Sequence, residues 1–133
     1  MRYLLDTCTA LWLWGDPVRL PEQVRRIIED TGNEIIFHQV STLEIQIKHS
    51  LGKLRLPQPP ETFIPAALRS HYITYQHLLD DDIFMWRKLP PVHDDPFDRI
   101  LVAHSLVSGA MLITPDKCIA EYPVRTIWEG LAG

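Results

Sequence analysis

The chain has 133 residues, of which 46% are hydrophobic and 23% are charged. This length supports one hydrophobic core and is too short for two ordinary domains, so we expect a single domain over residues 1–133. A formal net charge of −4 argues against a protein that holds nucleic acid by bulk positive charge alone. Any such binding must rely on local cations, such as Lys48, Lys53 and Arg55, and on divalent ions that neutralise acidic groups.

The start of the chain and its cysteines indicate the cellular compartment of the protein. No apolar run approaches the roughly 20 residues that cross a bilayer. Asp6 stands where a signal peptide would still be hydrophobic. We therefore expect a cytoplasmic protein with no membrane contact. Cys8 and Cys118 match no metal-binding or disulfide spacing, and we expect both to be buried, reduced thiols.

The first half of the chain predicts two strands, each followed by helices. In chain order these are a strand over residues 2–6, a helix ending at the turn 15–17, a helix starting at Pro21, a strand over 34–40 and a helix over 41–52. The strands are apolar runs rich in β-branched or aromatic side chains. The first helix has Thr7 or Thr9 as its expected cap, and proline suits the first position of the second helix.

The second half continues the alternation after a proline-rich loop over residues 56–60. It predicts a weak helix over 61–70, an edge strand over 72–75, helices over 77–88 and 96–108, and strands over 111–114 and 124–128. Strands that alternate with helices at these lengths imply right-handed crossovers. The sequence therefore predicts an α/β fold with a mostly parallel sheet covered on both faces.

Four acids follow these elements where a parallel sheet binds its ligands. Asp6 and Asp116 lie at or just past the ends of predicted strands, and Asp98 opens the helix before the strand 111–114. Glu44 lies in the first turn of the helix that follows the second strand. Because ligands bind outside the carboxyl ends of such strands, we expect the four carboxylates to converge on one edge.

Carboxylates held together in a partly desolvated site repel one another and raise each other's pKa, so the cluster is stable mainly when it holds a cation. Ligands that are all oxygen, without paired histidines or cysteines, favour Mg²⁺ or Mn²⁺ over zinc. Such ions lower the pKa of a bound water and stabilise charge on the departing oxygen of a phosphodiester. The acids therefore indicate metal-dependent phosphodiester hydrolysis.

Every one of these acids also fits a purely structural role. Asp6 could cap the first helix, Ser41 and Glu44 match a capping box, Asp95 fits the cap before Pro96 with Asp98 at the helix dipole, and Asp116 could be a turn residue. The sequence leaves both interpretations open for each residue.

Four further side chains are secondary candidates for the site. Asp95 adjoins Asp98, and Thr114 offers a hydroxyl beside Asp116. Lys48 lies one turn past Glu44, so it could be an ion-pair partner or reach substrate. Arg99 could neutralise a neighbouring acid, contact phosphate or form a surface ion pair.

Three segments carry a family resemblance. LLDTCTALWLWGDP, STLEIQIKHSLGKLRLP and LPPVHDDPFDRILVAHSLVSGAMLITPD resemble, in order, the PIN-domain ribonucleases of the VapC toxin type, over nearly the whole chain. The resemblance implies a three-layer α/β/α sandwich and an endonuclease that acts on RNA. It implies Mg²⁺ or Mn²⁺ bound by Asp6, Glu44, Asp98 and Asp116. It also implies a homodimer silenced by a cognate antitoxin whose tail packs over the acidic site.

The sequence departs from the pattern of that family at two positions, and two other protein classes remain as alternatives. Cys8 stands where that family often has a small polar residue or histidine, and Leu43 where a tryptophan is common. Neither departure removes a carboxylate. A phosphoryl-transfer domain also places acids at strand ends, but Cys8 stands where a phosphatase of that type would have a second aspartate. The non-enzyme alternative is a PIN-fold interaction module whose acids serve as helix caps.

Overall fold

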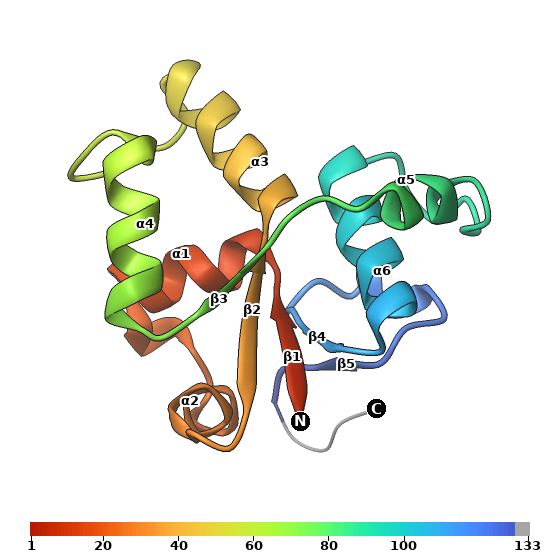
Figure 1. The fold of residues 1–133 in the computed structure, drawn as a ribbon, viewed down its shortest axis with the longest axis horizontal. Coiled ribbons are helices and arrows are strands. Elements are labelled where there is room, and N and C mark those ends of the chain that lie inside the picture. Colours follow the sequence, from red (N-terminus) through yellow and green to blue (C-terminus); the bar gives the residue numbers. More distant parts are fainter. Residues whose placement is uncertain (130–133) are drawn as a thin grey trace.

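Five short strands form one sheet in the computed structural model, which describes residues 1–129 (Figure 1). The strands are β1 (Arg2–Leu5), β2 (Glu34–His38), β3 (Thr74–Gln76), β4 (Met111–Ile113) and β5 (Thr126–Ile127). Their order is β3-β2-β1-β4-β5 and every neighbouring pair is parallel. The prediction of a parallel sheet is confirmed. The last four residues of the expected domain, 130–133, lie outside the described residues.

Helices cover both faces of this sheet. They are α1 (Thr7–Gly15), α2 (Glu22–Glu29), α3 (Gln39–Ser50), α4 (Pro60–Ser70), α5 (Asp80–Trp86) and α6 (Pro96–Ser108), with short 3-10 turns at Pro17–Arg19 and Ile119–Glu121. In Figure 1, α1 to α4 lie on one side of the strands and α5 and α6 on the other. The three-layer α/β/α architecture is confirmed. No described helix is long and apolar enough to cross a bilayer.

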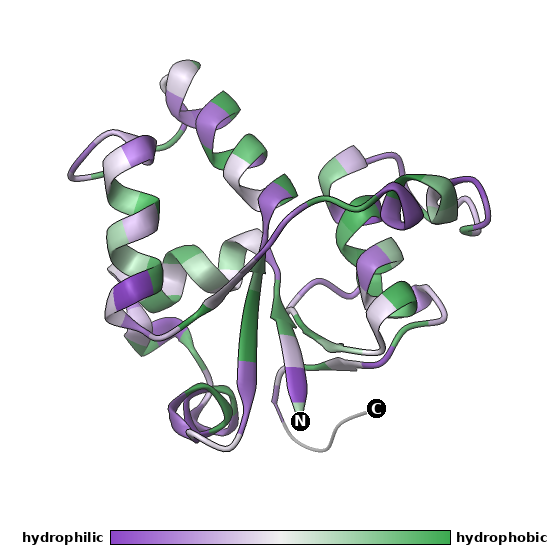
Figure 2. Cartoon of the chain, viewed as in Figure 1, coloured by the Kyte–Doolittle hydropathy of each residue, from purple (hydrophilic) through white to green (hydrophobic). Residues whose placement is uncertain are grey.

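The alternation of side chains along each strand builds two separate cores. Leu5 and Phe37 pack into one cluster with α1, α2 and α4, whereas their neighbours Leu4 and Ile36 pack into a second cluster with α5 and α6. Successive strand residues point to opposite faces, so a strand buried on both faces must be apolar throughout. Figure 2 shows this as hydrophobic colour along much of β1 and β2. The sheet is therefore buried on both faces, and polar residues are found at the carboxyl ends of its strands.

One boundary differs from the sequence prediction in a way that matters for the site. Strand β2 ends at His38, and α3 begins at Gln39 instead of Ser41. The reason is that His38 caps the helix, since its Nδ1 accepts a hydrogen bond from the backbone N–H of Val40 at 2.9 Å. The capping-box alternative for Ser41 and Glu44 is therefore wrong. Ser41 lies inside the helix, where its hydroxyl accepts a hydrogen bond from Thr7.

Other expected boundaries shift for local reasons. Asp6 caps α1, as one of the two interpretations of that residue proposed, and neither Thr7 nor Thr9 is the cap. Tyr72 has φ 55, in the left-handed region that a strand excludes, so β3 starts at Thr74. Helix α2 begins one residue after Pro21, β5 is shorter than predicted, and α5 covers only the middle of the predicted helix 77–88. Helix α6 has the predicted bounds.

Candidate functional site

Asp6 follows the last residue of β1 and uses its two carboxylate oxygens differently. Oδ1 accepts a hydrogen bond from the backbone N–H of Thr9 at 2.7 Å and caps α1. Oδ2 accepts a hydrogen bond from the hydroxyl of Thr114 at 2.6 Å, at the end of the adjacent strand β4. Burial raises the pKa of Asp6, the hydrogen bonds from Thr114 and Thr9 offset part of this, and the charge of Glu44 raises it further. Asp6 therefore serves as a cap and also belongs to the acidic cluster.

Glu44 is buried on α3 and has one oxygen free. Lys48, one turn later, donates a hydrogen bond from Nζ to Glu44 Oε2 at 2.5 Å. Lys48 is thus the i,i+4 partner of Glu44, one of the two roles that the sequence left open. Glu44 Oε1 is buried and has no hydrogen-bond partner among the described residues. A buried carboxylate oxygen without a donor is costly unless a ligand completes it.

Asp98 lies at the start of α6, and its neighbour Asp95 is the actual cap. The Asp95 carboxylate accepts hydrogen bonds from the backbone N–H groups of Phe97 and Asp98, and its side chain is exposed. Burial raises the pKa of Asp98 from its ordinary 3.8 to about 7, with further contributions from the charges of Asp95, Glu44, Asp116 and Asp6. The nearest basic group, His93 Nε2, is 3.9 Å from Asp98 Oδ2.

Asp116 lies in a turn after β4 and faces the same cluster. Its Oδ1 accepts a hydrogen bond from the backbone N–H of Cys118 at 2.8 Å. Its own N–H donates to the hydroxyl of Thr114 at 3.0 Å, the same hydroxyl that donates to Asp6. The turn interpretation is therefore correct, and the charge of Asp116 also raises the pKa of Asp98.

The charges of the other three acids contribute to the raised pKa of Asp98, and the charge of Glu44 contributes to that of Asp6, but the four carboxylates are not drawn tightly together. Within residues 1–129, no three of them bring a ligand oxygen each within 4.8 Å of one another. The arrangement still fits a hard divalent cation in three respects: the donors are all oxygen, one buried oxygen of Glu44 is unpartnered, and Asp98 resists ionisation without a counter-charge.

Two expectations about the surroundings are corrected. Arg99 is not at the acids: its guanidinium is buried and donates to the carbonyls of Trp86 and Pro90 and to the hydroxyl of Tyr122. It therefore joins α6 to the segment after α5. Cys118 is exposed and Cys8 is half-buried, so the expectation of two buried thiols is wrong, although both are free.

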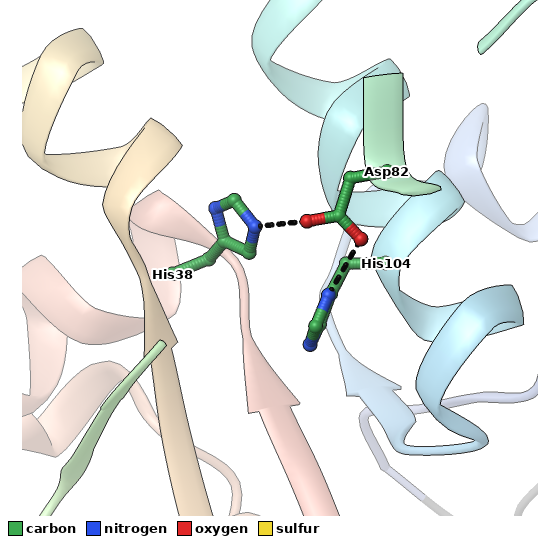
Figure 3. Close-up of side chains that lie close together, drawn as sticks. All are labelled: His38, Asp82 and His104. Atoms are coloured by element: carbon green, nitrogen blue, oxygen red, sulfur yellow. Dashed lines mark hydrogen bonds and ion pairs between the residues drawn. The ribbon is translucent and has the colours of Figure 1, made fainter. Parts of the chain in front are cut away.

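A second cluster was missed by the sequence analysis. His38, Asp82 and His104 are all buried, and their candidate ligand atoms lie within 4.8 Å of one another (Figure 3). They come from β2, α5 and α6, far apart in the chain. No local motif joins residues at such separations, so only the fold brings them together.

An apolar groove of about 900 Å³ opens between α3 and α4. Its lining includes Leu43, Thr42 and Gln46 from α3, and Ile64 and Leu68 from α4. Leu43 is 53% exposed there, one residue before Glu44. The groove and the acidic cluster therefore share helix α3.

Comparison with known proteins agrees with this architecture. The family model described as "PIN domain" matches residues 3–124. Over 47 residues the chain is 36% identical to "Ribonuclease VapC16" of Mycobacterium tuberculosis, a stretch that covers 35% of this chain and only 33% of that protein.

Solved structures share the fold at low sequence identity. VapBC2 from Rickettsia felis, bound to a promoter DNA fragment, matches with a TM-score of 0.69 and 15% identity over 92% of this chain and 94% of that chain. DNA-bound VapBC from Salmonella typhimurium matches with a TM-score of 0.68 and 14% identity over 96% and 97%. At identities this low, the TM-scores establish a common fold and nothing further.

Proposed function

Because the chain belongs to the PIN-domain family, we propose that it is an endoribonuclease that hydrolyses RNA phosphodiester bonds with Mg²⁺ or Mn²⁺. Asp6, Glu44, Asp98 and Asp116 would hold the metal. The single observation that carries the proposal is the buried Oε1 of Glu44, which has no hydrogen-bond partner among the described residues and lies in the cluster whose charges raise the pKa of Asp98. The match to a curated ribonuclease over part of the chain supports the choice of RNA as substrate.

Each residue has a part in this mechanism. A divalent ion bound by these carboxylates would supply an acidified water and neutralise charge on the phosphate. Thr114 and Thr9 fix the orientation of Asp6 through their hydrogen bonds. Lys48 orients Glu44 and, being half exposed, brings a positive charge to the rim of a site that must attract an anionic substrate.

The direct test is RNA cleavage by the purified full chain. Total RNA is incubated with protein and Mg²⁺, Mn²⁺ or chelator, and the products are separated by size. We expect cleavage with metal, none with chelator, and at least a 100-fold slower reaction for Asp98→Asn or Asp6→Asn, on the order of the loss expected when metal ligation fails. Glu29→Gln, which changes an exposed acid on α2, should cleave like the wild type.

The contrary outcomes are equally definite. Cleavage that persists in chelator, or that survives Asp98→Asn, contradicts the proposal. A protein that binds neither Mn²⁺ nor RNA while remaining folded would instead be the interaction module, the second candidate, whose acids act only as helix caps.

We further propose that the protein is the toxin of a toxin–antitoxin pair, a cytoplasmic homodimer whose cognate antitoxin packs its tail over the acidic site. Two of the similar structures are named as VapBC complexes. The apolar groove between α3 and α4 is suited to an amphipathic segment of the antitoxin, and Leu43 places it next to Glu44.

A groove substitution separates partner binding from catalysis. Leu43→Gln replaces an apolar contact on the exposed groove wall with a polar side chain and adds no charge beside Glu44. We expect it to weaken binding of the protein encoded by the neighbouring antitoxin gene by at least ten-fold, about 1.4 kcal/mol, and to leave RNA cleavage unchanged. Unchanged affinity in a calorimetric titration would remove the groove from the proposal, and light scattering of the wild type tests the homodimer.

A further inference from the structure

Asp82 accepts hydrogen bonds from two buried histidines at once (Figure 3). His38 Nε2 lies 2.9 Å from Asp82 Oδ2, and His104 Nδ1 lies 2.8 Å from Asp82 Oδ1. The backbone N–H of Leu79 donates to Oδ2 as well, at 3.0 Å. Burial raises the pKa of Asp82, but the hydrogen bonds from His38, Leu79 and His104 outweigh it and leave the pKa below its usual value. The carboxylate is therefore ionised and fully used as an acceptor.

The cap of α3 fixes the proton on His38. Because Val40 N–H donates to Nδ1, that nitrogen must be the bare acceptor, and the ring proton is on Nε2, facing Asp82. A metal ion at this cluster would need the lone pair of Nε2, and it would cost α3 its cap. The three side chains are therefore better described as a hydrogen-bonded tie than as a metal site.

The tie joins the two helices that carry site carboxylates. His38 caps α3 six residues before Glu44, and His104 lies on α6 six residues after Asp98. Asp82 lies on α5, which packs against α6. All three side chains are buried, so solvent does not compete for these hydrogen bonds.

We infer that Asp82 is a positioning residue: by holding His38 and His104 together it sets the distance between Glu44 and Asp98, and with it the affinity of the acidic site for its ion. The inference rests on the proposed function. Within it, Asp82 contacts neither metal nor RNA. Groups that orient metal ligands from behind are typically worth about ten-fold or more in metal affinity.

Two substitutions of Asp82 separate the tie from the charge. In Asp82→Asn the amide oxygen replaces Oδ2 and still accepts from His38 and Leu79, while the amide nitrogen replaces Oδ1 and donates to His104. This works only if His104 moves its proton from Nδ1 to Nε2, the nitrogen that has no partner among the described residues. In Asp82→Leu the side chain keeps its branched shape but becomes larger, and all three hydrogen bonds are lost.

The experiment measures Mn²⁺ binding by electron paramagnetic resonance of the free ion, and RNA cleavage as a function of Mn²⁺ concentration. We expect Asp82→Leu to weaken Mn²⁺ affinity about ten-fold, with cleavage recovering at high Mn²⁺, and Asp82→Asn to stay within about three-fold of the wild type. Long-range proton–nitrogen NMR of the imidazoles should show the His104 proton on Nδ1 in the wild type and on Nε2 in Asp82→Asn.

Controls address stability and folding. Val24→Ala removes two fully buried methyl groups from the other core cluster, so it lowers stability without touching the tie, and it should leave Mn²⁺ affinity unchanged. If Asp82→Leu does not fold, His38→Asn takes its place, because asparagine still caps α3 but no longer reaches Asp82.

Several results overturn the inference. These are wild-type Mn²⁺ affinity in folded Asp82→Leu or His38→Asn, an equal loss in Val24→Ala, or an unmoved His104 proton in Asp82→Asn. Zinc that binds the wild type and is lost with Asp82→Leu, but not with Asp98→Asn, would make the cluster a metal site instead. Failure of the proposed function looks different, because the wild type itself then binds no Mn²⁺, and no site remains for Asp82 to position.

Discussion

Asp6 is buried and Asp98 is half-buried at the sheet edge, and their surroundings differ. Asp6 accepts hydrogen bonds on both oxygens, from Thr9 and Thr114. Asp98 has an exposed neighbour, Asp95, that satisfies the backbone of the first helical turn, so its own carboxylate is left to the cluster. A single acid such as Asp6 can therefore be both a helix cap and a member of the acidic cluster. At α6 these two roles fall on different residues: Asp95 is the cap and Asp98 belongs to the cluster.

The raised pKa of Asp98 predicts how stability depends on pH in metal-free protein. The unfolded chain ionises this carboxyl near pH 3.8 and the folded protein near pH 7, so folding takes up a proton between these values. The contribution of Asp98 to the free energy of unfolding therefore falls as pH rises through this window and stays low above pH 7.

Asp98→Asn removes that dependence. We expect the free energy of unfolding of the variant, relative to that of the wild type, to rise by about 1–3 kcal/mol between pH 5 and pH 8, as measured by urea unfolding with chelator present. The expected rise is smaller than the full pKa shift implies because Asp98 is partly exposed to solvent. A difference between the two proteins that is constant across this range would contradict the assigned pKa.

Helix ends position the site at the scale of elements. Asp6 caps α1, His38 caps α3 and Asp95 caps α6, so three helices begin at the carboxyl edge of the sheet. Helix N-termini carry partial positive charge, which favours the anionic groups gathered there. At its other end α6 stops at Gly109, whose φ of 79 is open to glycine and strained for other residues.

Two glycines make a matched test of this helix end. A β-carbon built at Gly109 or at Gly15 meets no atom of the surrounding protein within 4 Å, so clashes with other elements play no part at either position. We expect Gly109→Ala to lower the free energy of unfolding by about 1 kcal/mol because of its left-handed backbone. Gly15→Ala, within helix α1, should raise it by about 0.4–1 kcal/mol. Thermal and urea unfolding measure both; equal effects would argue against the left-handed end of α6.

At the scale of the whole molecule, the buried parallel sheet carries mutually repelling carboxylates at its carboxyl edge. The edge strands β3 and β5 are short, which limits pairing with other chains. The fold therefore maintains a cluster of like charges at some cost, which an ion would relieve.

A divalent ion should accordingly stabilise the entire fold. At a Mn²⁺ concentration one hundred times its Kd, binding adds about 2.7 kcal/mol, which raises the melting temperature on the order of 10 °C for a chain of this size. Calorimetry with and without Mn²⁺ measures the shift. Asp98→Asn should lose most of it and Glu29→Gln should keep it, whereas equal shifts in all three proteins would indicate nonspecific binding.

Hydrophobic runs, turn residues and acids at strand ends are local signals, and from them the sequence predicted the alternating elements, the parallel sheet and the acids that surround Asp98. Helix α6 was predicted to the residue because Asp95, Pro96 and Gly109 mark its ends through local backbone chemistry. The early start of α3 escaped prediction because histidine is an uncommon cap, and here the ring of His38 is held in place by a residue of another helix.

Only the tertiary structure decided the partners of side chains that are distant in the chain. Arg99 bonds to the segment after α5 and to Tyr122, and Asp82 joins His38 to His104. Such contacts depend on how helices pack across the sheet, and no spacing in the sequence encodes that packing. The sequence by itself thus determined which acids could meet at the edge, and the fold decided how they are oriented, because burial and hydrogen-bond geometry arise only when the layers assemble.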